Sequence, residues 1–161
     1  MASRSEIRKA LKSRKYTKNY KLGKLLGSGA FGSAYTINRK NETNILKVIL
    51  KQNNSGFKYD FDNMERHILS YLGRPDICND YVICGKDHWE DNKNIYIITN
   101  LAEGTELSEY MKTKNCETFN KKELVILKLC QGLFYMHNIG VIHKDIKPSN
   151  IRIGPFKNDD N

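Results

Sequence analysis

The chain has 161 residues, 39% of them hydrophobic, and a formal net charge of +9. This length favours a single domain. No apolar run approaches the length of a membrane span and no secretory signal opens the chain, so we expect no membrane span and an intracellular protein, cytoplasmic or nuclear. The cysteines show neither C-x-x-C spacing nor pairing with histidine, and we therefore expect reduced, mostly buried thiols rather than a zinc site or disulfides. They are Cys78, Cys84, Cys116 and Cys130.

Much of the positive charge lies in residues 1–18, which hold seven basic residues and a single acidic one, Glu6. Such a basic leader can bind nucleic acid, an acidic partner or an anionic membrane, or act as an import signal. It can equally be a solvated, partly helical tail. Only Tyr16 and Tyr20 accompany these charges, fewer aromatic residues than a surface for single-stranded nucleic acid usually has. The sequence leaves these alternatives open.

The next segment has the pattern of a glycine-rich hairpin. Three short runs are typical of strands, namely residues 20–26, 33–37 and 45–50. Between the first two, Gly27-Ser28-Gly29-Ala30-Phe31-Gly32 spells G-x-G-x-x-G. Missing side chains allow backbone N–H groups to approach phosphate oxygens, and Phe31 can cap the turn. A dinucleotide-binding fold would need a helix opening at these glycines and an acidic residue about 20 positions later, and neither condition is met.

A charged side chain interrupts the third of these strands. Lys47 stands between Leu46 and Val48, and an ammonium group in an apolar sheet needs partners. Residues 60–72 follow with the apolar spacing of a helix, which Gly73-Arg74-Pro75 ends. Glu65 lies near the middle of this helix and is a candidate partner for Lys47; the alternative is a surface glutamate on an ordinary amphipathic helix.

Two further strands and a long helix are predicted after this point. Residues 81–83 and 95–99 read as the fourth and fifth strands, separated by the polar stretch 86–94. Asn120-Lys121-Lys122-Glu123 has the form of a capping box, which predicts a helix from Lys121 to about His137. Apolar residues cover most of its circumference, as expected for a helix buried on several sides.

The segment His143-Lys144-Asp145-Ile146-Lys147-Pro148-Ser149-Asn150 carries the most specific chemistry. Asp145 can accept the proton of an attacking hydroxyl, Lys147 can neutralise charge on a transferring phosphate, and Asn150 can ligate a metal through its carbonyl oxygen. His143 is expected to pack the loop rather than to carry a proton. These three residues, Asp145, Lys147 and Asn150, are the predicted catalytic residues.

These motifs, in this order, resemble the eukaryotic-type protein kinases, and Lys147 two residues after Asp145 resembles the serine/threonine branch. The resemblance covers nearly all of residues 20–156. It implies an α+β fold with a small lobe, made of a five-stranded antiparallel sheet plus one helix, and an incomplete, mostly helical large lobe. The expected domains are a basic extension at 1–19, the small lobe with glycine-rich loop and hinge at 20–101, and the start of the large lobe with the catalytic loop at 102–161.

The resemblance also implies a site for ATP and Mg²⁺, with Asn150 as a metal ligand and Lys47 bound to the α- and β-phosphates and to Glu65. Thr99 would be the gatekeeper and Asn100 would open the hinge. Ala34 and Ile45 stand where the family usually has valine and alanine, an exchange that would roughly conserve the volume above adenine. Drift in a poorly used pocket is the alternative. The expected cofactor-binding residues are Leu26, Gly27, Ser28, Gly29, Ala30, Phe31, Gly32, Ser33, Ala34, Ile45, Lys47, Glu65, Thr99, Asn100 and Leu101.

Several family motifs are missing after Asn150, namely the D-F-G aspartate, an activation segment and the A-P-E motif. Residues 151–153 read as one strand of the hairpin that normally carries D-F-G, so we expect a chain truncated before that motif. Lys144 replaces the family's arginine, which puts control by activation-loop phosphorylation in doubt. Because the long helix would lack its usual cover, we expect the isolated chain to be poorly soluble or partly unfolded.

The resemblance therefore implies an ATP-dependent serine/threonine protein kinase, present as a fragment or truncated form, that transfers the γ-phosphate of ATP to a protein hydroxyl. The activity of 161 residues alone is doubtful. The alternative is a catalytically inactive kinase remnant that binds nucleotide or a partner. The intact set of Lys47, Glu65, Asp145 and Asn150 argues for the enzyme, because a mere binding role would not retain each of them.

Overall fold

The computed structural model describes residues 2–29, 32–51, 64–113 and 119–154, except for the side chains of 64–66 and 119–120. The chain forms two compact units. The first consists of Met1–Asn79 and Ile83–Leu101, and the second of Asp80–Val82 and Ala102–Asn161. Each unit is described by itself.

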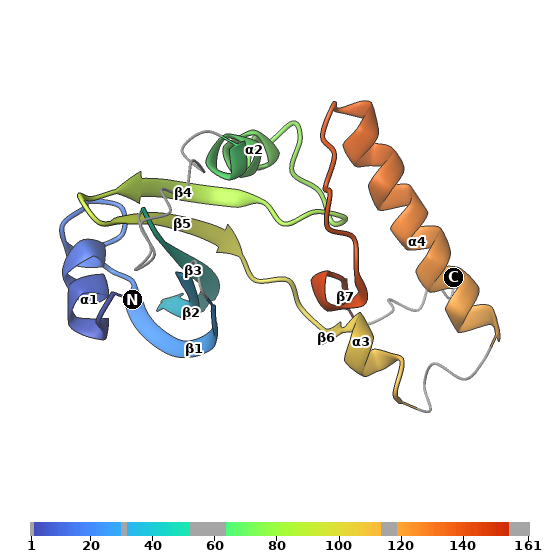
Figure 1. Ribbon diagram of the computed structural model, residues 1–161, viewed down its shortest axis with the longest axis horizontal. Coiled ribbons are helices and arrows are strands. Elements are labelled where there is room, and N and C mark those ends of the chain that lie inside the picture. Colours follow the sequence, from blue (N-terminus) through green and yellow to red (C-terminus); the bar gives the residue numbers. More distant parts are fainter. Residues whose placement is uncertain (1, 30–31, 52–63, 114–118, 155–161) are drawn as a thin grey trace. The chain divides into compact units, whose positions relative to one another are not determined.

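The first unit contains a five-stranded antiparallel sheet in the order β1-β2-β3-β5-β4 (Figure 1). The predicted five-stranded sheet of the small lobe is thereby confirmed. Its strands are β1 Lys21–Gly29, β2 Gly32–Arg39, β3 Glu42–Leu50, β4 Gly85–Glu90 and β5 Asn94–Asn100. Four of these overlap the predicted strands and extend them by a few residues at their ends.

The prediction of the fourth strand at residues 81–83 was wrong, because β4 lies at Gly85–Glu90 and so falls mostly in the polar stretch 86–94 that was expected to separate two strands. Only alternate residues of β4 are partly covered, and one of these is Asp87. The guanidinium of Arg14 lies 3.4 Å from Asp87 Oδ1 and stacks over the ring of Trp89 at 5.2 Å. A distant basic residue therefore partners this strand, and the usual apolar alternation is absent.

The two faces of the sheet differ in what covers them. On one face, here called the α1 face, a core of buried side chains packs against the N-terminal helix α1, Arg4–Lys12. On the opposite face, here called the α2 face, Ile49, Ile95 and Ile97 form a smaller cluster with Leu69 of helix α2, Met64–Leu72. The core on the α1 face consists of Ile7, Leu11, Tyr35, Ile37, Leu46, Val48, Tyr96 and Ile98.

The basic N-terminal segment is a docked helix rather than a solvated tail. Ser3 caps α1 in a full capping box with Glu6, so the segment's single acidic residue stabilises the helix start. Ile7 and Leu11 lie one turn apart, on the side that meets the sheet, and are 0% and 1% exposed. The Thr17 hydroxyl donates to the Leu11 carbonyl at 2.6 Å and fixes the turn that leads into β1.

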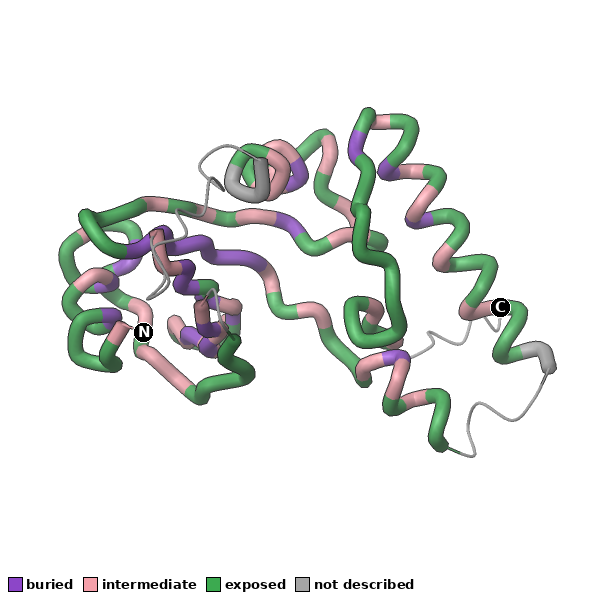
Figure 2. The backbone as a smooth tube through the Cα atoms, viewed as in Figure 1, coloured by how far each residue is buried: buried purple, intermediate pink, exposed green. Residues whose placement is uncertain are grey.

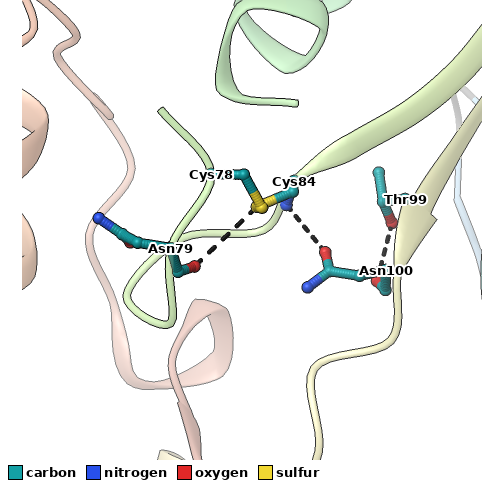
Figure 3. Close-up of a disulfide and its surroundings, with 5 residues drawn as sticks. All are labelled: Cys78, Asn79, Cys84, Thr99 and Asn100. Carbon is teal, nitrogen blue, oxygen red and sulfur yellow. Dashed lines mark hydrogen bonds between the residues drawn. A yellow bond between two sulfur atoms is a disulfide. The ribbon is translucent and has the colours of Figure 1, made fainter. Parts of the chain in front are cut away.

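The expectation of reduced cysteines was wrong for one pair, since Cys78 and Cys84 form a disulfide (Figure 3). After α2 the chain turns, with the Cys78 N–H donating to the Arg74 carbonyl, and this turn returns Cys78 to the start of β4. Their Cα atoms lie 5.6 Å apart. A separation of six residues matches no standard pairing motif, so spacing alone could not show it. Cys130 is a free, exposed thiol, and Cys116 lies outside the described residues.

The second unit holds two short strands, β6 Thr105–Glu106 and β7 Arg152–Ile153, which pair antiparallel with each other. The predicted strand at 151–153 therefore exists, and its partner in the described residues is β6. Helix α3 spans Leu107–Tyr110 and helix α4 spans Phe119–Asn138. Because α4 is already helical at Phe119, the predicted capping role of Asn120 was wrong.

Burial is distributed unequally between the units (Figure 2). Strand β5 is buried along nearly all its length, whereas α4 has only two buried residues, Gly132 and Met136, among those whose burial is described. Large apolar side chains of α4 are exposed, namely Ile126, Leu127 and Phe134. The expectation that α4 is buried on several sides does not hold within the described residues. Among the residues that the structure describes, no helix is long and apolar enough to cross a membrane.

Candidate functional site

The glycine-rich motif lies at the end of the β1–β2 hairpin, where Gly29 pairs with Gly32. A Cβ atom on Gly32 would lie 2.2 Å from the Val48 carbonyl oxygen, so the packing of β2 on β3 requires this glycine. Gly27 and Gly29 differ, since added Cβ atoms there would meet none of the described residues within 4 Å, and neither glycine has a positive φ. The described part of the fold does not require these two glycines, which leaves their backbone open to a ligand. Ala30 and Phe31 lie outside the described residues.

The strand register brings several predicted cofactor-binding residues together on the α2 face. Lys47 is directly opposite Ala34 on β2 and Ile97 on β5. Ile45, two residues earlier on the same face, is opposite Thr99. Thr99 is buried, while Ala34 and Ile45 are half-buried and Lys47 is exposed. Ala34 and Ile45 are thus diagonal neighbours across two strands, close enough for their sizes to compensate.

Four more of the predicted residues are Leu26, Ser28, Ser33 and Glu65. Leu26 is 55% exposed on β1. Ser33 is buried, and its hydroxyl oxygen has no hydrogen-bond partner among the described residues. Ser28 is exposed on the hairpin. The side chain of Glu65 lies outside the described residues, so the predicted ion pair with Lys47 stays a prediction.

Backbone groups at the end of β5 are held by Cys84, a residue that the motifs did not single out. The Asn100 N–H donates to the Cys84 carbonyl at 3.1 Å. The Cys84 N–H donates to Asn100 Oδ1 at 2.8 Å (Figure 3). The Thr99 hydroxyl donates to the Asn100 carbonyl at 3.1 Å. By contrast, Leu101 has no hydrogen bond among the described residues and is 38% exposed. Leu101, rather than Asn100, therefore offers unused backbone groups.

In the second unit, three polar side chains converge within the loop 143–150. Lys147 Nζ lies 2.8 Å from Asp145 Oδ2. The Asn150 amide donates through Nδ2 to the same carboxylate oxygen and to the Asp145 backbone carbonyl, both at 2.9 Å. The Asp145 N–H donates to His143 Nδ1 at 3.2 Å, so His143 contacts the loop backbone. A one-turn 3-10 helix, Pro148–Asn150, returns Asn150 toward Asp145.

These contacts favour the ionised form of the carboxylate. The hydrogen bond from Lys147, followed by that from Asn150, lowers the pKa of Asp145 below its usual value. Asp145 is also exposed, and solvent favours the same charged form. An ionised carboxylate accepts hydrogen bonds only, so Asp145 can orient a hydroxyl group and accept its proton as that oxygen attacks.

Asn150 is oriented by its partners, because both Nδ2 contacts are to oxygen acceptors. Its Oδ1 has no hydrogen bond in the part of the chain that the structure describes. An amide oxygen is a ligand that Mg²⁺ accepts. No cluster of three or more carboxylate, histidine or cysteine ligands occurs among the described residues. The loop thus fits a metal that takes its other ligands from water and phosphate, as Mg²⁺ usually does.

Comparisons with known proteins show the family to which the chain belongs. The family model of the protein kinase domain matches residues 20–158. The serine/threonine-protein kinase Aurora-2 of Arabidopsis thaliana is 32% identical over 150 residues, which cover 90% of this chain and 51% of that protein. A putative serine/threonine-protein kinase, L673, of Acanthamoeba polyphaga mimivirus is 34% identical over 144 residues, 88% of this chain and 25% of that protein.

A solved structure shows the same fold. Rad53, crystallised in complex with AMP-PNP, aligns with a TM-score of 0.65 at 20% sequence identity, covering 84% of this chain and 35% of that one.

Aurora kinase A-A of Xenopus laevis is 30% identical, and the match covers 84% of this chain and 33% of that protein. The chain therefore spans about half the length of the curated relatives it matches, or less.

Proposed function

The chain belongs to the protein kinase family, and from this premise we propose that it takes part in transfer of the γ-phosphate of ATP to a serine or threonine hydroxyl of a protein substrate. The observation that carries the proposal is the loop in which Lys147 and Asn150 hold Asp145 ionised. The order of the motifs and the serine/threonine kinase relatives support it.

Each residue of the loop has a role in this proposal. Asp145 accepts a hydrogen bond from the substrate hydroxyl, directs its oxygen at the phosphorus, and takes the proton as the bond to phosphorus forms. Lys147, 2.8 Å from Asp145, can also reach a phosphate oxygen and offset the charge that develops there. Asn150 positions Asp145 with Nδ2 and leaves Oδ1 for Mg²⁺, which when bound neutralises charge on the phosphates.

The nucleotide half of the proposal rests on the first unit. Gly27 and Gly29 offer backbone N–H groups without side chains in the way, and Lys47 stands on the α2 face as a cation for phosphate. Exposed Leu26 and half-buried Ile45 supply apolar surface for adenine. Leu101 supplies hinge backbone groups that are not already hydrogen-bonded in the structure.

Transfer is tested with a longer form of the protein or, failing that, with the full 161-residue chain, ATP, Mg²⁺ and a mixture of serine and threonine peptides. Asp145→Asn should lower the rate of phosphopeptide formation by about 10² to 10⁴, the usual range for a general base. Asp80→Asn, an exposed aspartate of the same unit outside the loop, is the control and should leave the rate unchanged. Equal rates for Asp145→Asn and the parent would refute the role of Asp145.

Nucleotide binding is tested separately by calorimetry. Lys47→Met should weaken ATP binding about tenfold or more, because one charge-assisted phosphate contact is lost. Lys51→Met, just beyond the same strand and paired with Glu90 at 3.2 Å, is the control. Binding that needs Lys47, without any phosphopeptide under any condition, would favour the alternative of an inactive nucleotide-binding protein.

The exchange of sizes above adenine gives a third test. If Ala34 and Ile45 together shape the pocket, Ile45→Ala should weaken ATP binding severalfold, because it removes apolar surface without replacing it. Unchanged or improved affinity would show that the exchange is drift.

Residues 1–18 support a second, separable proposal of an acidic partner or nucleic acid. Five of their cations are exposed and have no ion-pair partner in the described residues, namely Arg8, Lys9, Lys12, Lys15 and Lys18. Because α1 is docked, these charges are held on a fixed surface. Lys9→Glu/Lys12→Glu should abolish salt-dependent binding of a 20-base-pair duplex or of polyglutamate, and the ligand that is bound identifies the class. Binding of neither ligand would refute the proposal.

A further inference from the structure

The Cys78–Cys84 disulfide closes a ring at the junction between helix α2 and the sheet (Figure 3). Cys78 lies in the turn that follows α2, and Cys84 immediately precedes β4. The ring therefore ties the end of the helix to the start of an edge strand. Each end of this link is also fixed by other contacts.

On the strand side, Cys84 is the direct support of the end of β5. It exchanges two hydrogen bonds with Asn100, one through backbone groups at 3.1 Å and one to the Asn100 side chain at 2.8 Å. Asn100 in turn accepts a hydrogen bond from the buried Thr99. A displacement of Cys84 would therefore either break these hydrogen bonds or displace Asn100 as well. Leu101 follows Asn100 directly in the chain.

On the helix side, the backbone at the end of α2 lies directly against the backbone at the start of β4. A Cβ atom on Gly73 would lie 1.9 Å from the Gly85 carbonyl oxygen, and one on Gly85 would lie 2.2 Å from the Leu69 carbonyl oxygen. The end of α2 thus packs backbone against backbone on the residue after Cys84. When the disulfide is formed, the segment after helix α2 is bonded to Cys84, and Cys84 is hydrogen-bonded to Asn100.

The two cysteines differ in access. Cys78 is exposed, whereas Cys84 is 4% exposed. A small thiol can therefore approach from the Cys78 side, and the sulfur it displaces is the buried one. Cys130, the other cysteine that the structure describes, is an exposed thiol on α4 of the second unit and serves as an internal reference.

We propose that Cys78 and Cys84 form a reversible thiol–disulfide pair that clamps the end of β5, so that oxidation fixes the Asn100–Leu101 backbone and strengthens nucleotide binding there. The nucleotide part rests on the proposed function. Where glutathione keeps most thiols reduced, disulfides that do form are usually transient, catalytic or redox-sensing.

The chemistry balances with glutathione as the named reductant and glutathione disulfide as the oxidant. In reduction, a glutathione thiolate attacks Cys78 Sγ, the Cys78–Cys84 bond breaks, and Cys84 leaves as a thiolate that takes up a proton. A second glutathione then releases Cys78 as a thiol and forms glutathione disulfide. Two electrons pass from glutathione to the protein disulfide, and oxidation reverses each step.

The clamp predicts a local change in hydrogen exchange that can be measured without nucleotide. Asn100 N–H donates to Cys84, so hydrogen exchange at Asn100 reports directly on this contact. In glutathione disulfide the peptide map should show the Cys78–Cys84 cross-link, and Asn100 should exchange at least tenfold more slowly than in excess glutathione. ATP should bind about threefold or more tightly to the oxidised chain, because its hinge backbone is pre-organised.

Two variants complete the experiment on the full chain. Cys78→Ser, at an exposed position, should give the reduced-state exchange rate in both buffers, whereas Cys130→Ser should respond as the parent does. The proposal is overturned if no Cys78–Cys84 cross-link forms in glutathione disulfide, or if Asn100 exchanges equally in both buffers. The exchange of Asn100 in the two redox buffers is compared on the unmodified chain. The proposal can therefore be tested even if Cys78→Ser misfolds.

The nucleotide measurement separates this inference from the proposed function. Equal ATP affinity in both redox states would overturn the claimed effect on binding while leaving the nucleotide site intact. Redox-dependent exchange at Asn100 with no ATP binding in either state would support the clamp and refute the nucleotide site.

Discussion

The two units of this chain hold their structure in different ways. In the first, six consecutive residues of β5, Asn94–Thr99, are buried, and each face of the sheet has a helix against it. In the second, all residues of the loop 143–150 are exposed, and helix α4 presents Ile126, Leu127 and Phe134 to solvent within the described residues. Nevertheless, Lys147 and Asn150 of this loop both contact the carboxylate of Asp145.

The difference shows that the candidate residues of the first unit and those of the second unit are positioned by different forces. Lys47, Thr99 and Asn100 are positioned by strand register, which a buried core keeps in place. Asp145 is positioned by hydrogen bonds from Lys147 and Asn150, residues within five positions of it. Stability measurements should therefore respond strongly to changes in the first unit, and weakly to changes in the loop or on the exposed face of α4.

The largest expected effect is on the helix that covers the α1 face. Leu11→Ala removes a side chain that is 1% exposed in the core and should lower the free energy of unfolding of the first unit by about 2 to 5 kcal/mol. Urea unfolding followed by the fluorescence of Trp89 reports on this unit, because Trp89 is the single tryptophan and stacks on Tyr96 at 4.9 Å. Lys9→Ala, on the exposed side of the same helix, should change it by less than about 0.5 kcal/mol.

A loss of less than 1 kcal/mol for Leu11→Ala would mean that α1 is not an integral layer of the unit. The first unit would then not depend on a helix against its α1 face, and this difference from the exposed second unit would disappear.

The next effect is the pH dependence of the first unit. A hydrogen bond from Lys86 is the main cause that lowers the pKa of Glu42 to about 2. Since the unfolded chain binds this proton more readily, the stabilisation is full above about pH 5 and is lost as the pH falls toward 2. Both side chains are more than a third exposed, so we expect at most about 1 kcal/mol.

Unfolding of the first unit at pH 3 and pH 6, again followed by Trp89, measures this term. Glu42→Gln should reduce the difference in stability between the two pH values, and Glu103→Gln, an exposed carboxylate of the second unit, should not. An identical pH dependence for the parent and Glu42→Gln would contradict the assignment.

A smaller effect is expected on the exposed face of α4. Phe134→Ser, at a side chain that is 69% exposed, should change helical stability measured by circular dichroism by no more than about 0.5 kcal/mol. It should raise solubility, because exposed apolar surface promotes association. Met136→Ala, on the buried side of the same helix, should instead cost about 2 kcal/mol or more. Equal destabilisation by the two changes would show that this face of α4 is covered in solution.

The smallest effect on stability is expected in the loop itself. Lys147→Ala removes the main cause of the lowered pKa of Asp145, which should rise toward its usual value while the unfolding curves stay unchanged. Carboxyl carbon NMR titration of Asp145 measures this. Lys144→Ala, a neighbouring lysine that is not among the causes of the shift, is the control. A pKa that stays low in Lys147→Ala would mean that Asn150 alone holds the carboxylate.

Much of the fold was predictable, because the first three strands, the fifth strand and helix α4 have local patterns of sufficient length. The fourth strand was not, since its inward residue Asp87 finds its partner in Arg14, 73 positions away. The grouping of Asp145, Lys147 and Asn150 was predictable, because the three residues lie within one loop, and their catalytic roles stay a prediction. The support that Cys84 gives to Asn100 was missed, because it depends on a contact between strand ends.

Residues a few positions apart encode the glycine-rich hairpin, the lysine of β3 and the loop around Asp145, so local spacing was enough to predict them. Packing between remote segments places the basic leader as a helix against the sheet, joins Cys78 to Cys84, and leaves Gly27 and Gly29 open while Gly32 is covered. The physical reason is distance along the chain: local spacing specifies turns and helix faces, whereas burial and strand pairing depend on which remote segments pack together.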